Sequence, residues 1–470
     1  ALLSWLSWLP MIYWTNIFPQ LVELLRQVPW LDPAGLGRAN LQLLLLLVAS
    51  ALMLLMVSIG SWLGRKRLRR FHQGLLFLVM LVFTAGFAVT FCVAPAGVNV
   101  LVQNALAPGG AGQGPLWIDL NQMITLLAGE SVVDVLLGFR LVGVLVHVVN
   151  TVLIWLIVGR TRPEARLSTT LLYAWNPLVL LLVVLAPNLG IVALCLLLLA
   201  ALCYQRDRLM LSWVFVVLAA LIYLQFVFFL PLMLHIIMRK TRMRRAGRRA
   251  LWWLGFWIIS LLVVALAYLP YWQDGSINTQ LTSLRQVFWP DQVANSLASA
   301  LLNLPLSLPP QVAWLVDGHY WVLAALVLVG LFFLLALWLA DTLELVLLCG
   351  CWILLLLLIF MPVYWPWFVL VPLVLGLCAE SQSTKLLVVF LTLGALLDYY
   401  FWQWPRVWTG QALVAVWLPL LLWGWALFFA STWRMARARA EAAASVAPAK
   451  GISRPPWFPW GSSRPGRLGR

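Results

Sequence analysis

Apolar runs of about 20 residues recur along most of this sequence, and short basic segments separate them. A helical run of that length covers the roughly 30 Å hydrocarbon core of a bilayer. Only 10% of the residues are charged, against about 25% in soluble globular domains. The sequence therefore predicts an all-α polytopic membrane protein rather than a soluble domain.

The basic residues indicate how the chain is oriented. Of the 31 Lys and Arg residues, which give a net charge of +16, most lie in residues 65–70, 160–166, 206–208, 239–249 and 434–470. These short segments between or after apolar runs follow the positive-inside rule for cytoplasmic loops. The placement favours membrane topology and contact with anionic lipids over nucleic-acid binding.

We divide the chain into three parts. Residues 1–40 form an external, Trp-rich interfacial segment. Residues 41–433 form the transmembrane bundle, with long external loops at 96–131 and 270–318. Residues 434–470 form a basic cytoplasmic helix and a tail rich in Pro and Trp. We expect about 13 transmembrane helices, an external N-terminus, a cytoplasmic C-terminus and a bacterial plasma membrane.

The runs differ in how clearly they predict a single crossing. Residues 167–186 and 189–204 read as a hairpin of two helices. Residues 209–238 carry basic clusters at both ends, which predicts two short or re-entrant segments. The remaining spans are expected at 41–63, 74–95, 132–158, 251–269, 319–340, 345–361, 366–379, 386–401 and 411–433.

A polar stripe interrupts the third of these spans. Arg140, Gly143, His147 and Asn150 are spaced so that they share one helix face. An arginine at this depth must face the bundle interior or water. Two interpretations stay open: Arg140, His147 and Asn150 bind a phosphate or lipid headgroup, or the stripe joins helices by hydrogen bonds.

Other polar residues are weaker candidates. Asn188, in the turn between the two helices of the hairpin, and Arg285, in the second long loop, could also contact a phosphate. Asp119 in the first long loop is the candidate catalytic base, although it could simply be solvated. Asp341 and Glu344 stand one helical turn apart at a span end, where solvated charge is the expected role.

Cysteine and tryptophan usage limits the cofactors. The six cysteines lie in apolar runs without Cys-x-x-Cys or Cys/His spacing, so we expect buried thiols and no metal site. Most of the 29 Trp residues fall near span ends, as interfacial anchors do. This Trp-rich rim could instead contact a flat ligand. Trp457, Phe458 and Trp460 are expected to anchor the tail on a partner protein or lipid.

A set of short motifs resembles the GT-C class of membrane glycosyltransferases, which use polyprenyl-phosphate sugars. The most specific is Tyr-Ala-Trp-Asn-Pro-Leu-Val-Leu at 173–180. The other matching blocks are 114–116, 139–141, 147–150, 221–225, 230–232, 268–270 and 364–368. The resemblance covers roughly residues 75–430 and implies a GT-C-like, mannosyltransferase-like bundle acting at the external membrane face.

The sequence departs from the family pattern at its catalytic positions. Members of the class usually carry an acid early in the first external loop, and residues 94–99 have none. A second family acid is replaced by leucines after Asn176-Pro177-Leu178. Sugar transfer needs a base for the acceptor proton and cations for the leaving phosphate. We therefore expect a chain that is degenerate at its catalytic motifs.

Three functions follow from this comparison, and the first is favoured. In the first, the chain is a structural or accessory subunit of a larger membrane complex, for example a bioenergetic or photosynthetic one. It is otherwise an active lipid-linked glycosyltransferase, or a transporter or lipid-binding protein. The subunit interpretation requires no cofactor. If the chain binds a ligand, the candidates are polyprenyl phosphate, a phospholipid or a pigment.

Overall fold

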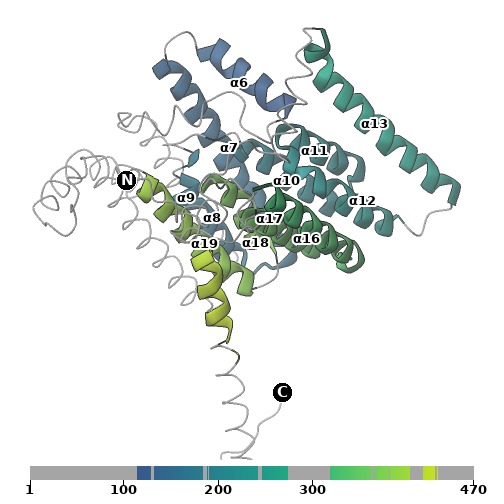
Figure 1. The fold of residues 1–470 in the computed structure, drawn as a ribbon. Helices are drawn as coiled ribbons and strands as arrows, with labels where there is room; N and C mark the ends of the chain where they lie inside the picture. The colour runs from purple at the N-terminus through teal and green to yellow at the C-terminus, as the bar shows by residue number, and fades with distance from the viewer. Residues whose placement is uncertain are drawn as a thin grey trace, which may run out of the picture. The chain divides into compact units, whose positions relative to one another are not determined.

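A computed structural model shows a protein built from helices (Figure 1). It describes residues 114–128, 132–180, 182–183, 188, 190–241, 246–273, 318–360, 364, 366–379, 382–402, 417–428 and 431. Within these ranges the regular structure is helical and no sheet forms. The predicted all-α class is therefore confirmed for the described part of the chain.

The helices follow one another with short connections. In order they are α6 (Pro115–Ala128), α7 (Val132–Thr161), α8 (Arg166–Ala174), α9 (Pro177–Leu180), α10 (Gly190–Gln205), α11 (Leu209–Ile222), η3 (Leu224–Phe228), α12 (Phe229–Lys240), α13 (Ala246–Gln273), α16 (Gly318–Leu339), α17 (Leu343–Phe360), η5 (Pro366–Val369), α18 (Leu370–Cys378) and α19 (Gln382–Trp402). A further apolar helix spans Leu418–Phe428.

Three of the described helices are long and apolar enough to cross a membrane: Gly138–Thr161 in α7, Leu251–Trp272 in α13 and Leu343–Phe360 in α17. Shorter apolar helices accompany them, including α10 and α11. The three long helices indicate an integral membrane protein, because a run of this hydropathy can be placed in lipid with all its backbone hydrogen bonds satisfied.

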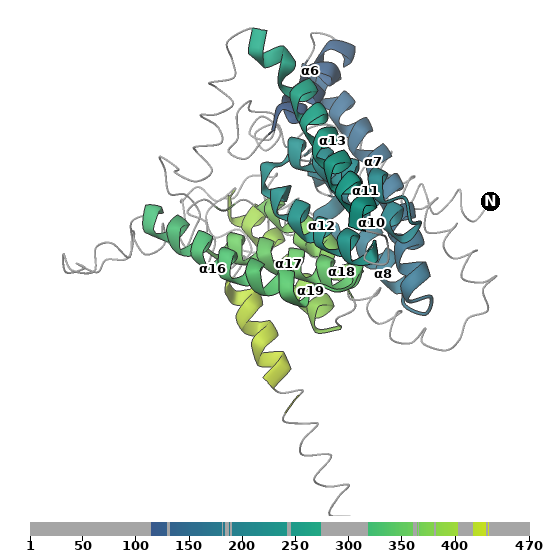
Figure 2. The same cartoon turned by 90° about the vertical axis from the view of Figure 1, so that its right-hand side faces the viewer.

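Helix α10 packs closely against both α7 and α11, and α17 packs between α16 and α18 (Figures 1 and 2). One continuous apolar core joins these two groups. Helix α13 is different, because only 11% of its apolar window is buried. It contacts α11 through a small cluster around Trp213 and Phe256. Most of the apolar surface of this helix is therefore not covered by protein, as is typical of a lipid-facing helix.

Two predictions for the hairpin and its neighbour have different outcomes. The expected helix at 167–186 is broken, since α8 ends at Ala174 and α9 begins at Pro177. Proline disfavours the helical conformation of the residue before it, so the chain turns at Asn176. The expectation of two short segments at 209–238 is confirmed, because η3 separates α11 from α12.

The first external loop is not entirely irregular. Its end, residues 115–128, forms α6, which packs on α7 and α11. The predicted parts 1–40, 41–63, 74–95 and 434–470 lie outside the described residues. So do residues 96–113 and 129–131 of the first long loop and residues 274–317 of the second.

Candidate functional site

The polar stripe on α7 is buried as a unit. Arg140 is 4% exposed, and His147 and Asn150 are 0% exposed. Gly143 lies close to the segment after α9, because a Cβ added to Gly143 would sit 2.9 Å from the Val183 carbonyl oxygen. The spacing argument therefore placed the four residues correctly on one inward face.

Hydrogen bonds connect the stripe to two other helices. His147 Nδ1 and the Tyr173 hydroxyl of α8 are hydrogen-bonded at 3.3 Å, and their rings lie 5.1 Å apart. Asn150 Nδ2 donates to the Ile191 carbonyl of α10 at 3.2 Å. The stripe thus joins α7 to α8 and α10, which is the role of interhelical polar residues in membrane bundles.

Asn176 explains the most specific motif in local structural terms. Its Oδ1 accepts from the backbone N–H groups of Leu178 (3.0 Å) and Val179 (3.3 Å). Its Nδ2 donates to Thr392 Oγ1 of α19 at 3.1 Å. Asparagine before a proline at the first helical position is a favoured helix start. The Trp-Asn-Pro-Leu sequence is therefore a capped helix start that also ties α9 to α19.

Asn188 performs a similar capping role before α10. Its Oδ1 accepts from the Gly190 N–H at 2.7 Å and from the Tyr223 hydroxyl at 3.1 Å. These three residues line a cavity of about 20 Å³ together with Gln225, Phe226 and aromatic residues of η5. That volume suits one water molecule, whereas small-molecule pockets measure about 300–1,000 Å³.

Asp119 lies on α6, apart from the α7 stripe. The Tyr271 hydroxyl near the end of α13 donates to Asp119 Oδ1 at 2.7 Å, and the Pro115 carbonyl oxygen lies 3.1 Å from the same hydroxyl. Asp119 is half-buried rather than fully solvated. This bond brings together the first long loop and the beginning of the second.

Several candidate residues are not placed by the structure. Arg285, Trp457, Phe458 and Trp460 lie outside the described residues. Asp341, expected to be a solvated helix-end charge, forms an ion pair with Arg239 while staying exposed. Among the described residues, the cysteines are free and no His, Cys, Asp and Glu side chains cluster as metal ligands would.

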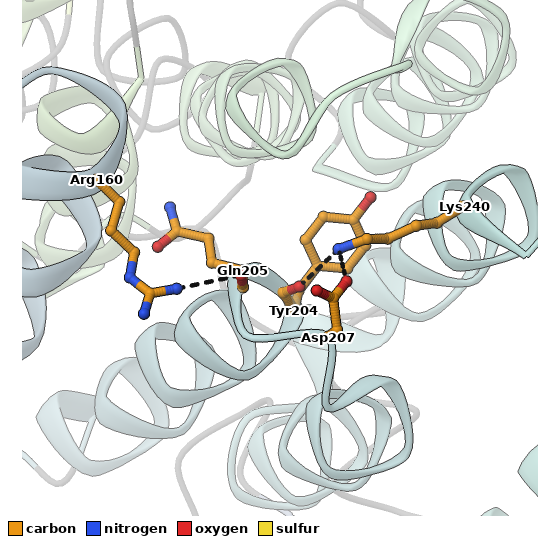
Figure 3. Close-up of polar contacts among 5 residues, drawn as sticks. All are labelled: Arg160, Tyr204, Gln205, Asp207 and Lys240. Carbon is orange, nitrogen blue, oxygen red and sulfur yellow. Dashed lines mark hydrogen bonds and ion pairs between the residues drawn. The ribbon is translucent and has the colours of Figure 1, made fainter.

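The sequence did not predict a group of polar contacts where α7, α10 and α12 end, which we call the basic end of the bundle (Figure 3). Arg160 Nη1 donates to the Gln205 carbonyl at 3.1 Å, and Lys240 Nζ donates to the Tyr204 carbonyl at 3.1 Å. Lys240 also pairs with Asp207, which adopts φ 61° in the turn after α10. The basic residues that were predicted to be cytoplasmic therefore also connect the ends of α7, α10 and α12.

Arg162 provides a second connection at a helix end. Its Nη2 donates to the carbonyl oxygens of Cys378 and Ala379, both at 2.8 Å, at the end of α18. A cation there also complements the negative end of the helix dipole. Lys385, 8% exposed, donates to Thr169 Oγ1 of α8 at 3.0 Å. Both contacts join residues 216 positions apart, beyond the range of sequence periodicity.

Comparisons with known proteins do not extend this description. No protein-family model matches the sequence, and no curated protein is significantly similar to it.

Proposed function

We propose that this chain is a structural or accessory subunit of a larger membrane complex, built on a GT-C-like bundle that is degenerate at its catalytic positions. The observation that carries this proposal is the closure of the α7 stripe. Arg140, His147 and Asn150 are covered by protein, and His147 and Asn150 bond to neighbouring helices. A site that transfers a sugar must admit a donor and an acceptor, whereas interhelical polar residues need no access.

Two asparagines, Asn176 of the Tyr-Ala-Trp-Asn-Pro-Leu motif and the candidate residue Asn188, support the same proposal. Asn176 accepts two local bonds that fix the start of α9. Asn188 accepts one local bond, at the start of α10, and a second from the distant Tyr223 hydroxyl. The cavity beside Asn188 has room for about one water. These residues are used in folding the bundle, as expected of a scaffold that has kept the packing motifs of a transferase.

We propose about 13 crossings for the whole chain, with the N-terminus outside and the C-terminus in the cytoplasm. The meeting of Arg160, Gln205, Asp207 and Lys240 at one end supports this orientation. Basic loop residues gathered at one end of a helical bundle are typical of its cytoplasmic side.

The subunit proposal is tested by deleting residues 445–470, the part of the tail that carries Trp457, Phe458 and Trp460. We expect the full-length chain to purify with fixed protein partners in a mild detergent, and the deleted chain to lose them. The thermal transition of the bundle should stay unchanged. A monodisperse, partner-free full-length chain would refute the proposal.

A second function, lipid-linked sugar transfer, is favoured by the hydrogen bond between Tyr271 and Asp119. A carboxylate held in one position next to both long loops is suitable for a general base, and such a base contributes about 10²–10⁴-fold to rate. Under this alternative, Asp119→Asn lowers polyprenyl-phosphate-dependent transfer by about 100-fold or more. Tyr271→Phe, which keeps the carboxylate, should lower it less. Equal transfer in both variants and the wild type would remove Asp119 from consideration.

A further inference from the structure

A groove of about 460 Å³ opens at the basic end, between α12 and the junction of α16 with α17. These three helices lie side by side in both views (Figures 1 and 2). The groove is lined by His235, Arg239, Leu337, Trp338, Leu339 and Asp341. It therefore combines a cationic wall on α12 with an apolar wall on α16, and it lies apart from the α7 stripe.

The cationic wall has hydrogen-bonding capacity left for an anion. Arg239 pairs with Asp341, and both side chains are partly exposed. A guanidinium has five N–H donors, more than one carboxylate can occupy. Within the described residues, His235 Nε2 has no hydrogen-bond partner. A covered polar atom without a partner costs free energy, which a bound oxyanion would offset after a small ring movement.

The apolar wall continues along α16 as a stripe. Leu323, Val327, Leu331, Leu334 and Trp338 recur at intervals of three or four residues, and each is more than half exposed. At the α-helical rise this stripe extends about 22 Å. One leaflet of hydrocarbon is about 15 Å thick. The stripe is therefore long enough to accompany an acyl chain from the groove towards the bilayer centre.

We propose that this groove binds one anionic phospholipid. Arg239 contacts the phosphate oxygens, with His235 as the second donor, and Trp338 lies at the headgroup level, where tryptophan is favoured. One acyl chain follows the stripe on α16. The apolar stripe on α16 favours a lipid over free phosphate, because a soluble anion has no acyl chain to bury against it.

Native mass spectrometry of the full chain in detergent, titrated with dioleoyl phosphatidylglycerol or dioleoyl phosphatidylcholine, tests this proposal. We expect one phosphatidylglycerol to bind more tightly than phosphatidylcholine. Arg239→Gln should weaken the phosphatidylglycerol adduct about fivefold, the effect of roughly 1 kcal/mol per basic residue. Arg206→Gln is the matched control, because Arg206 is exposed in a turn at the same end but does not line the groove. It should leave the preference unchanged.

Asp341→Asn provides an independent check. It removes the competing carboxylate and should strengthen phosphatidylglycerol binding, whereas a purely structural ion pair predicts no gain. Equal binding of the two lipids, or equal losses in Arg239→Gln and Arg206→Gln, would overturn the proposal. Displacement of the lipid by millimolar inorganic phosphate would also overturn it in favour of a free-anion site. Unchanged thermal transitions establish that the variants are folded.

Discussion

Asn176 offers the sharpest test of how the bundle is held together. The substitution Asn176→Ala removes one oxygen that accepts the N–H groups of Leu178 and Val179, and one amide that donates to Thr392. All these groups are buried. The variant therefore loses a helix cap and an interhelical hydrogen bond together, and two partner variants separate them.

The expected loss follows from the two contributions. Losing an Asn cap costs about 1 kcal/mol, within a range of about 0.5–2. An interhelical side-chain hydrogen bond in a membrane protein averages about 0.6 kcal/mol. We expect Asn176→Ala to lower the free energy of unfolding by about 1.5–2 kcal/mol. Thr392→Val removes the acceptor and also the bond that the hydroxyl donates to the Val388 carbonyl of its own helix. Because such a back-bond adds little to helix stability, the variant should cost about 0.6 kcal/mol.

The assay is reversible unfolding by SDS in mixed micelles, followed by far-UV circular dichroism. The double variant should reveal a coupling of about 0.6 kcal/mol between the two positions. Asn176→Ser, which keeps a capping oxygen but cannot reach α19, should resemble Thr392→Val. A wild-type free energy of unfolding for Asn176→Ala would refute the capping role. Zero coupling would refute the bond to Thr392.

Further predictions use the same unfolding assay. Gly350→Ala should destabilise the bundle by about 1–3 kcal/mol, because the new Cβ would lie 2.2 Å from the Phe229 ring. Gly330→Ala on the adjacent helix, which meets no atom within 4 Å, should be neutral or stabilising by up to about 1 kcal/mol; equal losses at both glycines would contradict the packing of α17 on α12. Arg162→Met should cost about 1–3 kcal/mol, since two carbonyls at the end of α18 lose a charged donor, and an unchanged midpoint would argue against that contact. Trp213→Phe should cost about 1 kcal/mol through its lost bonds to α13; a stability equal to wild type would place α13 away from α11.

Sequence periodicity predicted the features that depend on local spacing. The α7 stripe was placed on one face because helical residues at intervals of three and four must share it. The division of residues 209–238 followed from basic clusters at both ends of a run too short for two full crossings. Apolar run lengths likewise placed α13, α16 and α17 within a few residues of their ends.

The features that were missed depend on tertiary contact or on a local signal that was given another meaning. Asn176-Pro177 was assigned to a family motif, although the same dipeptide predicts a capped helix start. The bonds from Arg162 to α18 and from Lys385 to Thr169 connect distant parts of the chain, and no single-sequence pattern specifies them. Helix α6 was missed because the segment before it is rich in glycine.

The measurement that tests the central claim most directly is the intact mass of the natively purified assembly. The full-length chain, expressed at its natural level and extracted in a mild detergent, is examined by native mass spectrometry. We predict a mass above that of one chain, with other protein subunits in fixed stoichiometry. A single chain that carries polyprenyl phosphate and turns over a lipid-linked sugar would contradict the subunit proposal and return attention to Asp119.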